Sequence, residues 1–306
     1  IILLLNRRGY ASFISCKNCG FVFKCPHCDI TLTYHKSTNN LRCHYCGYAE
    51  KIENICPDCK EKSITSLGVG TEKIEEELLS IYPNIKISRM DFDTTSKKGS
   101  HAKIIKEFKE HKQDILLGTQ IVAKGLDFEN VTLVGVLNAD TSLNIPDFKS
   151  SETTFSLLSQ VSGRSGRSTK EGEVIIQTFN KEHYAIQYVK NHNYLGFYKE
   201  EMKIRQKLKY PPFYYIVYIR ISSKDNDTCY KESLKIKKSL ERYLDKTIIL
   251  GPSATNVFKL NNIYRYGIIL KYKNQDNLID ILNKMINAYK GNHKVTVDLN
   301  FNPGHL

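Results

Sequence analysis

The sequence lacks several features that mark common protein classes. It has no apolar run long enough to span a bilayer, no signal-peptide pattern at its start and no low-complexity tract. It also has neither a Gly-x-x-x-x-Gly-Lys-Ser/Thr loop to cradle phosphates nor an apolar strand ending in Asp-Glu to hold magnesium. These absences exclude a membrane-spanning helix and a complete nucleotide-hydrolysing site within the 306 residues.

The composition, by contrast, is that of a globular protein. Hydrophobic residues make up 41% of the chain and charged residues 25%, and the length suits about two domains. The opening segment IILLL is typical of a buried strand. Because the first residue is Ile and not Met, we expect the sequence to begin inside a longer natural chain.

Positive charge is in excess and unevenly distributed. The formal net charge is +13, and residues 211–306 carry 15 basic and 8 acidic residues, whereas residues 16–59 carry five and four. Basic surfaces attract polyanions, nucleic acids first among them. A general bias towards lysine is the alternative explanation, and the charge by itself does not separate the two.

Eight of the nine cysteines lie in four Cys-x-x-Cys pairs between residues 16 and 59. Each pair places two sulfurs on one tight turn, and two pairs complete a tetrahedron around a zinc ion. We expect a nested arrangement, because only five residues separate the first two pairs, which is tight for a closed site; sequential pairing is the alternative. The nested ligands are an inner set of Cys25, Cys28, Cys43 and Cys46 and an outer set of Cys16, Cys19, Cys56 and Cys59.

Other chemistries suit these cysteines less well than zinc. Disulfides need an oxidising compartment, and nothing in the sequence indicates export. Iron–sulfur clusters usually use other spacings. Eight thiolates fill two sites and leave no open ligand position, which favours structural over catalytic zinc. We therefore expect the neighbouring His27, His35 and His44 to be surface residues rather than ligands, and the ninth cysteine, Cys229, to be a buried thiol.

Downstream of the cysteines, apolar strands alternate with amphipathic helices. A helix is predicted in TEKIEEELLSIY, capped by Thr71 and ended by Pro83. Continuous apolar strands between helices indicate an α/β fold with a buried, mostly parallel sheet. The cysteine-rich segment falls between the first strand and the first helix and is predicted to be an insert. The other predicted strands are NIKISRMD, DILLGTQ, VTLVGVLNAD and GEVIIQTF, and the other helices are HAKIIKEFKEHK and ETTFSLLSQVSG.

A second α/β unit is predicted after the prolines at 211 and 212. Its elements follow the order βαββαβ, which makes a small sandwich. Tyr264 and Tyr266 flank Arg265; aromatics beside basic residues suit exposed bases and phosphates, although alternation along this strand also fits packing in a sheet. The expected domains are the first strand of the parallel sheet in 1–15, the two-zinc insert in 16–59, the rest of that sheet in 60–182, a helical linker in 183–210 and a C-terminal nucleic-acid-binding domain in 211–306.

Three stretches resemble the signature motifs of superfamily-two helicases. LLSQVSGRSGR at 157–167 resembles motif VI, ILLGTQIVAKGLDF at 115–128 resembles motif V, and LLLNRRGYA at 3–11 resembles the motif IV region, in matching order. With the cysteine pairs, GTEKIEEEL, RMDFDTT, YPPF, ILGPS and YRYGIILKYK, the resemblance is to the replication-restart DNA helicases and covers essentially the whole chain. It is to the C-terminal part of such proteins, so the parallel sheet is expected to be the second RecA-like lobe.

The resemblance implies roles for residues of the ATP site. Arg164 and Arg167 would point at the phosphates of ATP, with Arg167 as the arginine finger, since a guanidinium offers fixed, bidentate donors. Gln160 would couple the nucleotide to closure of the lobes. Gly125 and Asp127 would contact the nucleotide or its bound water.

The resemblance also implies partners and a cellular role. Thr119 would contact a DNA phosphate, and Arg265 is our candidate DNA contact in the C-terminal unit. The full protein would be an ATP-dependent 3′-to-5′ DNA helicase that recognises stalled or repaired forks and reloads the replication machinery. It would bind two Zn²⁺ in this part, and ATP with Mg²⁺ together with an upstream lobe. Its partners would be forked or branched DNA, single-stranded DNA, single-stranded DNA-binding protein and primosome proteins, with no membrane, in the bacterial cytoplasm at the nucleoid.

One alternative is a non-motor zinc-ribbon protein that binds nucleic acid. It predicts that the segment from Gln160 to Arg167 has no role and that no ATP-binding lobe precedes the chain. A metabolic α/β enzyme with structural zinc is a second alternative, but the sequence contains no phosphate loop or catalytic dyad to support it.

Overall fold

A computed structural model describes residues 1–5, 13–35, 38–66, 70–95, 99–119, 122, 128, 131–163, 172–274 and 276–304. None of the helices in these ranges combines the length and apolar character that crossing a membrane requires. The chain forms two compact units. The parallel-sheet unit contains Ile1–Val22, Ile55–Ile145 and Lys149–Lys199, and the antiparallel-sheet unit contains Phe23–Asn54, Pro146–Phe148 and Glu200–Leu306.

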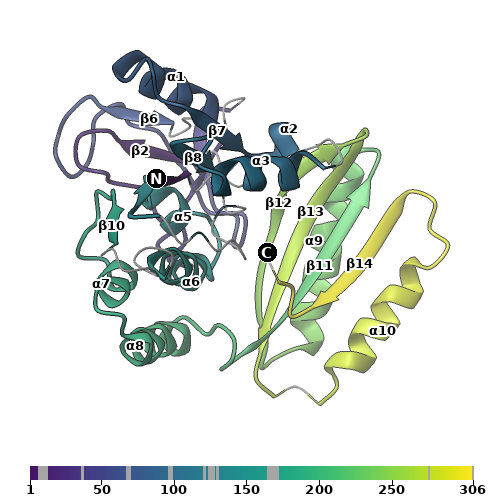
Figure 1. The fold of residues 1–306 in the computed structure, drawn as a ribbon. Helices are drawn as coiled ribbons and strands as arrows, with labels where there is room; N and C mark the ends of the chain where they lie inside the picture. The colour runs from purple at the N-terminus through teal and green to yellow at the C-terminus, as the bar shows by residue number, and fades with distance from the viewer. Residues whose placement is uncertain are drawn as a thin grey trace. The chain divides into compact units, whose positions relative to one another are not determined.

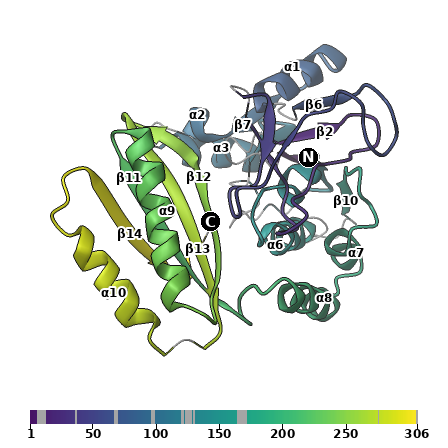
Figure 2. The ribbon, with the colours of Figure 1, turned by 180° about the vertical axis from the view of Figure 1, so that it is seen from behind.

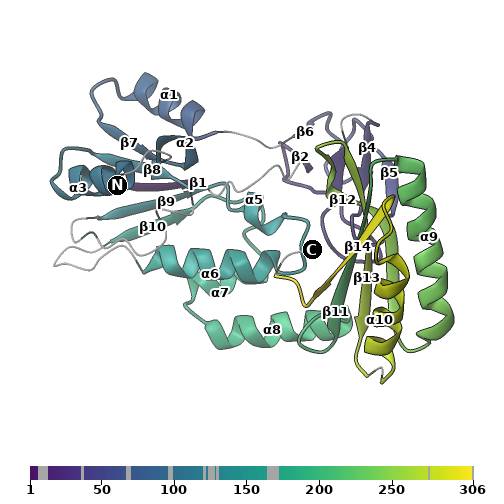
Figure 3. The same ribbon diagram turned by 90° about the vertical axis from the view of Figure 1, so that its right-hand side faces the viewer.

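The parallel-sheet unit is built around five strands in the order β10-β9-β1-β8-β7, all parallel. Figure 3 shows the strands stacked in this order. The apolar opening segment forms the central strand, as its continuous hydrophobicity predicts for a strand buried on both faces. The strands are β1 (Ile2–Leu5), β7 (Ile87–Met90), β8 (Ile115–Gly118), β9 (Leu133–Leu137) and β10 (Glu173–Ile176).

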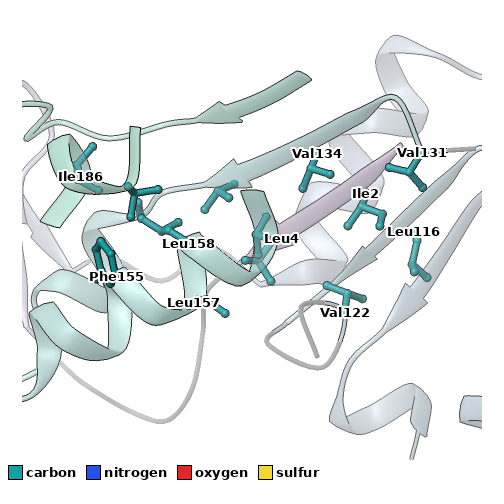
Figure 4. Close-up of a cluster of buried hydrophobic side chains, with 14 of the residues drawn as sticks. Ile2, Leu4, Leu116, Val122, Val131, Val134, Phe155, Leu157, Leu158 and Ile186 are labelled. Carbon is teal, nitrogen blue, oxygen red and sulfur yellow. The ribbon is translucent and has the colours of Figure 1, made fainter. Parts of the chain in front are cut away.

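Helices connect these strands and cover the sheet (Figure 1). The core combines Ile2 and Leu4 of β1 and Val134 of β9 with Phe155 and Leu158 of α6, and Figure 4 shows these side chains gathered together. The α/β class with a parallel sheet is confirmed. The helices are α1 (Thr71–Ile81), α2 (Phe92–Thr95), α3 (Ser100–Lys109), α5 (Asp140–Leu143), α6 (Ser150–Ser162), α7 (Tyr184–Lys190) and α8 (Tyr194–Lys207), the last of which runs from one unit into the other.

The predicted cap of α1 is wrong by one residue. Gly70 is the N-cap, and Thr71 is the first helical residue. The Thr71 hydroxyl donates instead to the Asp91 carboxylate at 2.7 Å. Asp91 also lies 2.8 Å from the Arg89 guanidinium. An N-cap hydroxyl lies outside the helix and accepts from a backbone N–H, whereas Thr71 is already helical and its hydroxyl donates to a charged acceptor at the end of β7.

The antiparallel-sheet unit contains a sheet in the order β12-β13-β11-β14 with α9 and α10 (Figure 2). In the chain the order is β11-α9-β12-β13-α10-β14, which confirms the predicted βαββαβ arrangement. Val217, Ile219 and Ile268 of the sheet pack with Ile236 and Leu240 of α9. The elements are β11 (Tyr215–Ser223), α9 (Asn226–Tyr243), β12 (Ile248–Leu260), β13 (Ile263–Tyr272), α10 (Leu278–Tyr289) and β14 (Val295–Phe301).

The second face of this sheet is buried over part of β11 and β13. Because side chains alternate along a strand, Ile216 and Tyr218 of β11 and Ile269 and Lys271 of β13 point away from the face that packs with the helices. Ile216 and Ile269 are each 1% exposed and Lys271 is 5% exposed. A lysine inside a protein needs compensating partners, and Lys271 has two: the Leu208 carbonyl and the Tyr210 ring.

Candidate metal centres

Each of the four Cys-x-x-Cys pairs forms the same backbone turn. The N–H of the first cysteine donates to the carbonyl five residues later, and the N–H four residues later donates to the carbonyl of the first cysteine, with N···O distances of 2.8–3.0 Å. The fourth residue after the first cysteine adopts the positive φ that this turn requires. A glycine directly after a pair, as in CKNCG and CHYCG, is therefore a sequence signal of the turn that cysteine spacing alone does not carry. The four residues are Gly20 (φ 77°), Asp29 (54°), Gly47 (85°) and Lys60 (63°).

The turns bring the eight sulfurs together in two groups of four. All ligand atoms of a group lie within 4.8 Å of one another. Tetrahedral zinc with Zn–S bonds of about 2.3 Å places its sulfurs about 3.8 Å apart, so both groups have the dimensions of a zinc site. The grouping is the nested one, with Cys25, Cys28, Cys43 and Cys46 inside and Cys16, Cys19, Cys56 and Cys59 outside. Three Sγ–Sγ distances are 3.5–3.6 Å, for Cys16–Cys59, Cys19–Cys56 and Cys25–Cys46.

In each group, one cysteine is favoured in the thiolate form that binds metal, whereas burial raises the pKa of Cys19 and hydrogen bonds with Cys25 raise the pKa of Cys28 and Cys43. Burial opposes ionisation of Cys16, but hydrogen bonds from the Ser63 hydroxyl and from the N–H groups of Cys19 and Asn18 outweigh it and lower the pKa of Cys16 to about 6. In the inner group, hydrogen bonds from Cys28 and Cys43, and then from backbone N–H groups, lower the pKa of Cys25. Both groups therefore fit zinc in size and in chemistry.

The outer group closes the two ends of the cysteine-rich segment. β2 (Ile14–Cys16) pairs antiparallel with β6 (Ile64–Ser66). Gly20, on the first turn, lies against Phe179, since a Cβ built on Gly20 would be 2.2 Å from the Phe179 Cβ. The buried Asp140 carboxylate accepts from the Phe179 N–H at 2.9 Å and so holds this residue in place.

Replacing Gly20 with Ala is expected to destabilise the parallel-sheet unit by more than about 2 kcal/mol. A left-handed alanine costs about 1–2 kcal/mol, and the new methyl group would also displace the Phe179 ring. Gly47→Ala is the matched control, because Gly47 has a similar φ but nothing closer than 3.6 Å to a built Cβ. Denaturant unfolding of both variants measures the difference, and equal losses would contradict the Gly20–Phe179 contact.

A ribbon of three antiparallel strands accompanies the inner group: β3 (Thr33–His35), β4 (Asn40–Arg42) and β5 (Ala49–Lys51). Cys43 and Cys46 lie in the turn between β4 and β5, and the other two cysteines precede β3. The third turn lies along β12. The His44 Nδ1–H donates to the Ala254 carbonyl at 2.5 Å, and the Ser253 hydroxyl donates to the His44 carbonyl. Gly47 lies close to the same segment, since its built Cβ would be 3.6 Å from the Pro252 carbonyl oxygen. The third turn is therefore attached to β12 of the C-terminal sheet through both the side chain and the backbone carbonyl of His44.

Tyr210 contacts the turn that holds Cys25 and Cys28, and Lys271 in turn contacts Tyr210. Tyr210 is 2% exposed, and its hydroxyl donates to the Cys28 carbonyl at 3.2 Å. The Lys271 ammonium lies 3.5 Å from the centroid of the Tyr210 ring and donates to the Leu208 carbonyl at 3.2 Å. Burial lowers the pKa of Lys271 to about 8, while the thiolates of the inner group oppose this shift. Phe148 stacks on Tyr210, with the two ring centroids 4.7 Å apart.

The histidines of the segment differ in their surroundings. His27 is exposed, as expected, whereas His35 and His44 are half-buried, so the surface prediction is wrong for these two. His44 bonds to β12, and the His35 ring lies beside it, with the two ring centroids 5.1 Å apart. No histidine belongs to either four-residue group among the described residues. Cys229 is fully buried, as expected.

The residues predicted to contact nucleotide fall partly outside the described ranges. Arg164, Arg167, Gly125 and Asp127 lie outside them. Gln160 is exposed in the last turn of α6, and its amide donates to the Ser156 hydroxyl at 3.3 Å.

The two predicted DNA contacts belong to different units. Thr119 directly follows β8, and its N–H donates to the Met90 carbonyl at 3.3 Å. It lies at the carboxyl edge of the parallel sheet, where ligands of α/β proteins bind. Arg265 is half-buried on β13, paired with Ser222 of β11. Alternation places Arg265 on the same face as Lys271, away from the face that packs with α9.

Comparisons with known proteins match each part of the chain. Three family models match: the PriA DNA helicase Cys-rich region domain over residues 25–51, the helicase conserved C-terminal domain over 50–169, and the primosomal protein N C-terminal domain over 206–303. The first of these spans the inner cysteine group and its ribbon.

Curated proteins named replication restart protein PriA are similar over nearly the whole chain. The Bacillus subtilis protein is 47% identical over 306 residues, covering 99% of this chain and 38% of its own length. The Synechocystis protein is 41% identical over 89% of this chain and 33% of its own length. The Haemophilus influenzae protein is 34% identical over 100% of this chain and 42% of its own length. The chain thus spans less than half the length of these relatives.

Proposed function

The chain belongs to the replication restart protein PriA family, and on this premise we propose that it is the C-terminal part of an ATP-dependent 3′-to-5′ DNA helicase. The whole protein recognises stalled or repaired replication forks and reloads the replication machinery. The observation that carries this proposal is the 47% identity over 306 residues to a replication restart protein. The helicase C-terminal domain match over 50–169 does not favour a non-motor zinc-ribbon protein.

The chain supplies two Zn²⁺ sites and half of an ATP site. The two four-cysteine groups hold the zinc ions, which are structural because each has four thiolate ligands and no open position. Bound zinc supplies fixed geometry and no reaction step. The domain limits proposed are 1–15 and 60–182 for helicase lobe two, 16–59 for the zinc segment, 183–210 for the linker and 211–306 for the DNA-binding domain.

The ATP site is completed by a lobe that this sequence does not contain. That lobe would bind the phosphates of ATP and Mg²⁺, and Arg167 and Arg164 of this chain would supply positive charge to the phosphates during transfer. Gln160 would couple the nucleotide to closure of the lobes, and Gly125 and Asp127 would contact the nucleotide or its bound water. Thr119 holds a phosphate of the single strand on which the motor moves.

The partners of the whole protein follow from its task. They are forked or branched DNA, single-stranded DNA, single-stranded DNA-binding protein and primosome proteins. The protein acts in the bacterial cytoplasm at the nucleoid.

The 306-residue chain alone is expected to show no DNA-stimulated ATP turnover, because it has no phosphate-binding loop and no Asp-Glu strand. A coupled ATPase assay compares it with the full-length protein, which is expected to hydrolyse ATP and to unwind a fork carrying a 3′ arm. Turnover by the 306 residues alone would contradict the half-site, and a full-length protein that binds forks without hydrolysing ATP would contradict the helicase assignment.

DNA binding by residues 211–306 is expected to depend steeply on salt. One face of α9 carries three exposed basic residues, Lys231, Lys238 and Arg242. Lys238 and Arg242 follow Lys231 by seven and eleven residues, which is about two and three helical turns. Replacing all three with Gln should weaken binding to forked DNA by a similar factor whatever the base sequence of the DNA. It should also make the log–log salt slope shallower by about 0.9 for each phosphate that the protein no longer neutralises.

The control for this variant removes equal charge from the other unit. Lys103, Lys106 and Lys109 of α3 are equally exposed, and their replacement with Gln is expected to leave the slope less changed. Fluorescence anisotropy at several salt concentrations measures both. The whole chain is used, because residues 211–306 alone would lose the bond of β12 to His44 and the contact of Lys271 with Tyr210. A salt slope that changes only with the α3 variant would contradict the assignment of DNA binding to residues 211–306.

A further inference from the structure

The cysteine-rich segment is divided between the two units of the chain. The first and fourth cysteine pairs belong to the parallel-sheet unit, and the second and third pairs belong to the antiparallel-sheet unit. The division falls at Val22–Phe23 and Asn54–Ile55, between the outer and the inner group. The two metal centres, although nested in sequence, are therefore parts of different folded bodies.

Each centre is attached to its own body by contacts distant in sequence. The inner centre is joined to the C-terminal sheet by His44 to Ala254, 210 residues apart, and by Tyr210 to Cys28, 182 residues apart. The outer centre is joined to the parallel-sheet unit by the contact of Gly20 with Phe179. The turn of Cys43 and Cys46 lies along β12 of the C-terminal sheet, and Ile216 and Ile269 on the second face of that sheet are each 1% exposed. We therefore expect loss of the inner centre to expose part of this face.

Electrostatics adds a second link at the inner centre. Four thiolates around one divalent ion leave a net charge of about −2, which is costly to bury without compensation. Lys271 is the buried cation next to the inner centre: it contacts Tyr210, whose hydroxyl bonds to Cys28, and it interacts electrostatically with Cys28 and Cys43. Partners of this kind beyond the ligands commonly change metal affinity 10–100-fold.

We propose that the inner zinc centre is a structural part of the C-terminal sheet, with Lys271 and Tyr210 as its positioning residues, and that the outer centre serves only the parallel-sheet unit. Each unit then depends on its own metal ion, and the two ions are released independently. This inference rests on the proposed two-zinc content, and it goes further by assigning each ion to one unit.

A matched pair of ligand variants of the full-length protein tests the assignment. Cys46→Ser and Cys59→Ser each remove the second cysteine of a pair, and both residues are half-buried. Hydrogen exchange followed by mass spectrometry is expected to show faster exchange in β12 and β13 for Cys46→Ser, with β9 and β10 unchanged. Cys59→Ser is expected to affect β2, β6 and β10 and to leave β13 unchanged. Equal effects of either variant on both units would overturn the proposal.

A second measurement does not depend on ligand loss. Lys271→Met keeps most of the side-chain volume and removes the charge; Lys273→Met is the control, because Lys273 is two residues on and exposed. With two zinc ions bound per chain, release to a chelator should have two phases, and Lys271→Met should speed one of them about tenfold or more. Tyr210→Phe should speed the same phase. If both release phases are unchanged in Lys271→Met, the role of Lys271 is overturned. Fewer than two zinc ions in the unaltered protein would instead overturn the two-zinc content given under the proposed function.

Discussion

Replacing Arg167 with Ala in the full-length protein is expected to lower DNA-stimulated ATP turnover by about a thousandfold or more, while DNA binding stays nearly unchanged. An arginine finger contributes roughly 10³–10⁵ to the rate of phosphoryl transfer, because it neutralises charge that develops only in the transition state. It makes little difference to DNA binding, since DNA contacts are expected at other residues such as Thr119 and the basic face of α9. Steady-state ATPase assays and anisotropy binding on one preparation measure both.

Arg167→Lys is the informative companion. Lysine keeps the charge but lacks the planar, bidentate fork of the guanidinium, so it should restore only a small part of the lost rate. Full activity in Arg167→Lys would mean that a positive charge without fixed geometry suffices. Full activity in Arg167→Ala would contradict the role that the Gln-x-x-Gly-Arg-x-Gly-Arg sequence implies.

Removing the metal ions is expected to have the largest effect on stability. Metal analysis of the purified protein should return about two zinc equivalents per chain, and a chelator strong enough to remove both should unfold the cysteine-rich segment. Structural zinc sites contribute on the order of 10 kcal/mol in small zinc peptides, which is comparable to the whole stability of a typical domain. Thermal unfolding with and without zinc measures the loss, and readdition of zinc should restore the folded state.

A single-ligand variant separates the two centres within this experiment. Cys43→Ser should retain about one equivalent of zinc and should disorder the inner ribbon, while the parallel sheet keeps its own transition. One equivalent in the unaltered protein, or iron in place of zinc, would contradict the two four-cysteine centres.

Local sequence patterns determined the elements and the ligands. The period of the apolar residues placed the parallel strands and the helices between them, because burial on both faces requires continuous hydrophobicity. The spacing of the cysteine pairs separated an inner from an outer group, because a turn of fixed geometry needs a minimum length of chain to close a site. The two short helices α2 and α5 carry no comparable signal and were not predicted. The cap of α1 was misplaced because the Asp91 carboxylate, 20 residues away in sequence, takes the Thr71 hydroxyl.

Only the tertiary structure decided which body each metal centre joins. Nothing in the spacing of the cysteines distinguishes Tyr210 from the other tyrosines or Lys271 from the other lysines. Tyr210 contacts Cys28 from 182 residues away, and Lys271 contacts Tyr210. The partner of a buried lysine is set by how a sheet and a ribbon pack, and a local pattern of residues contains no information about that packing. For the same reason the sequence predicted one insert, whereas its two halves fold with different units of the protein.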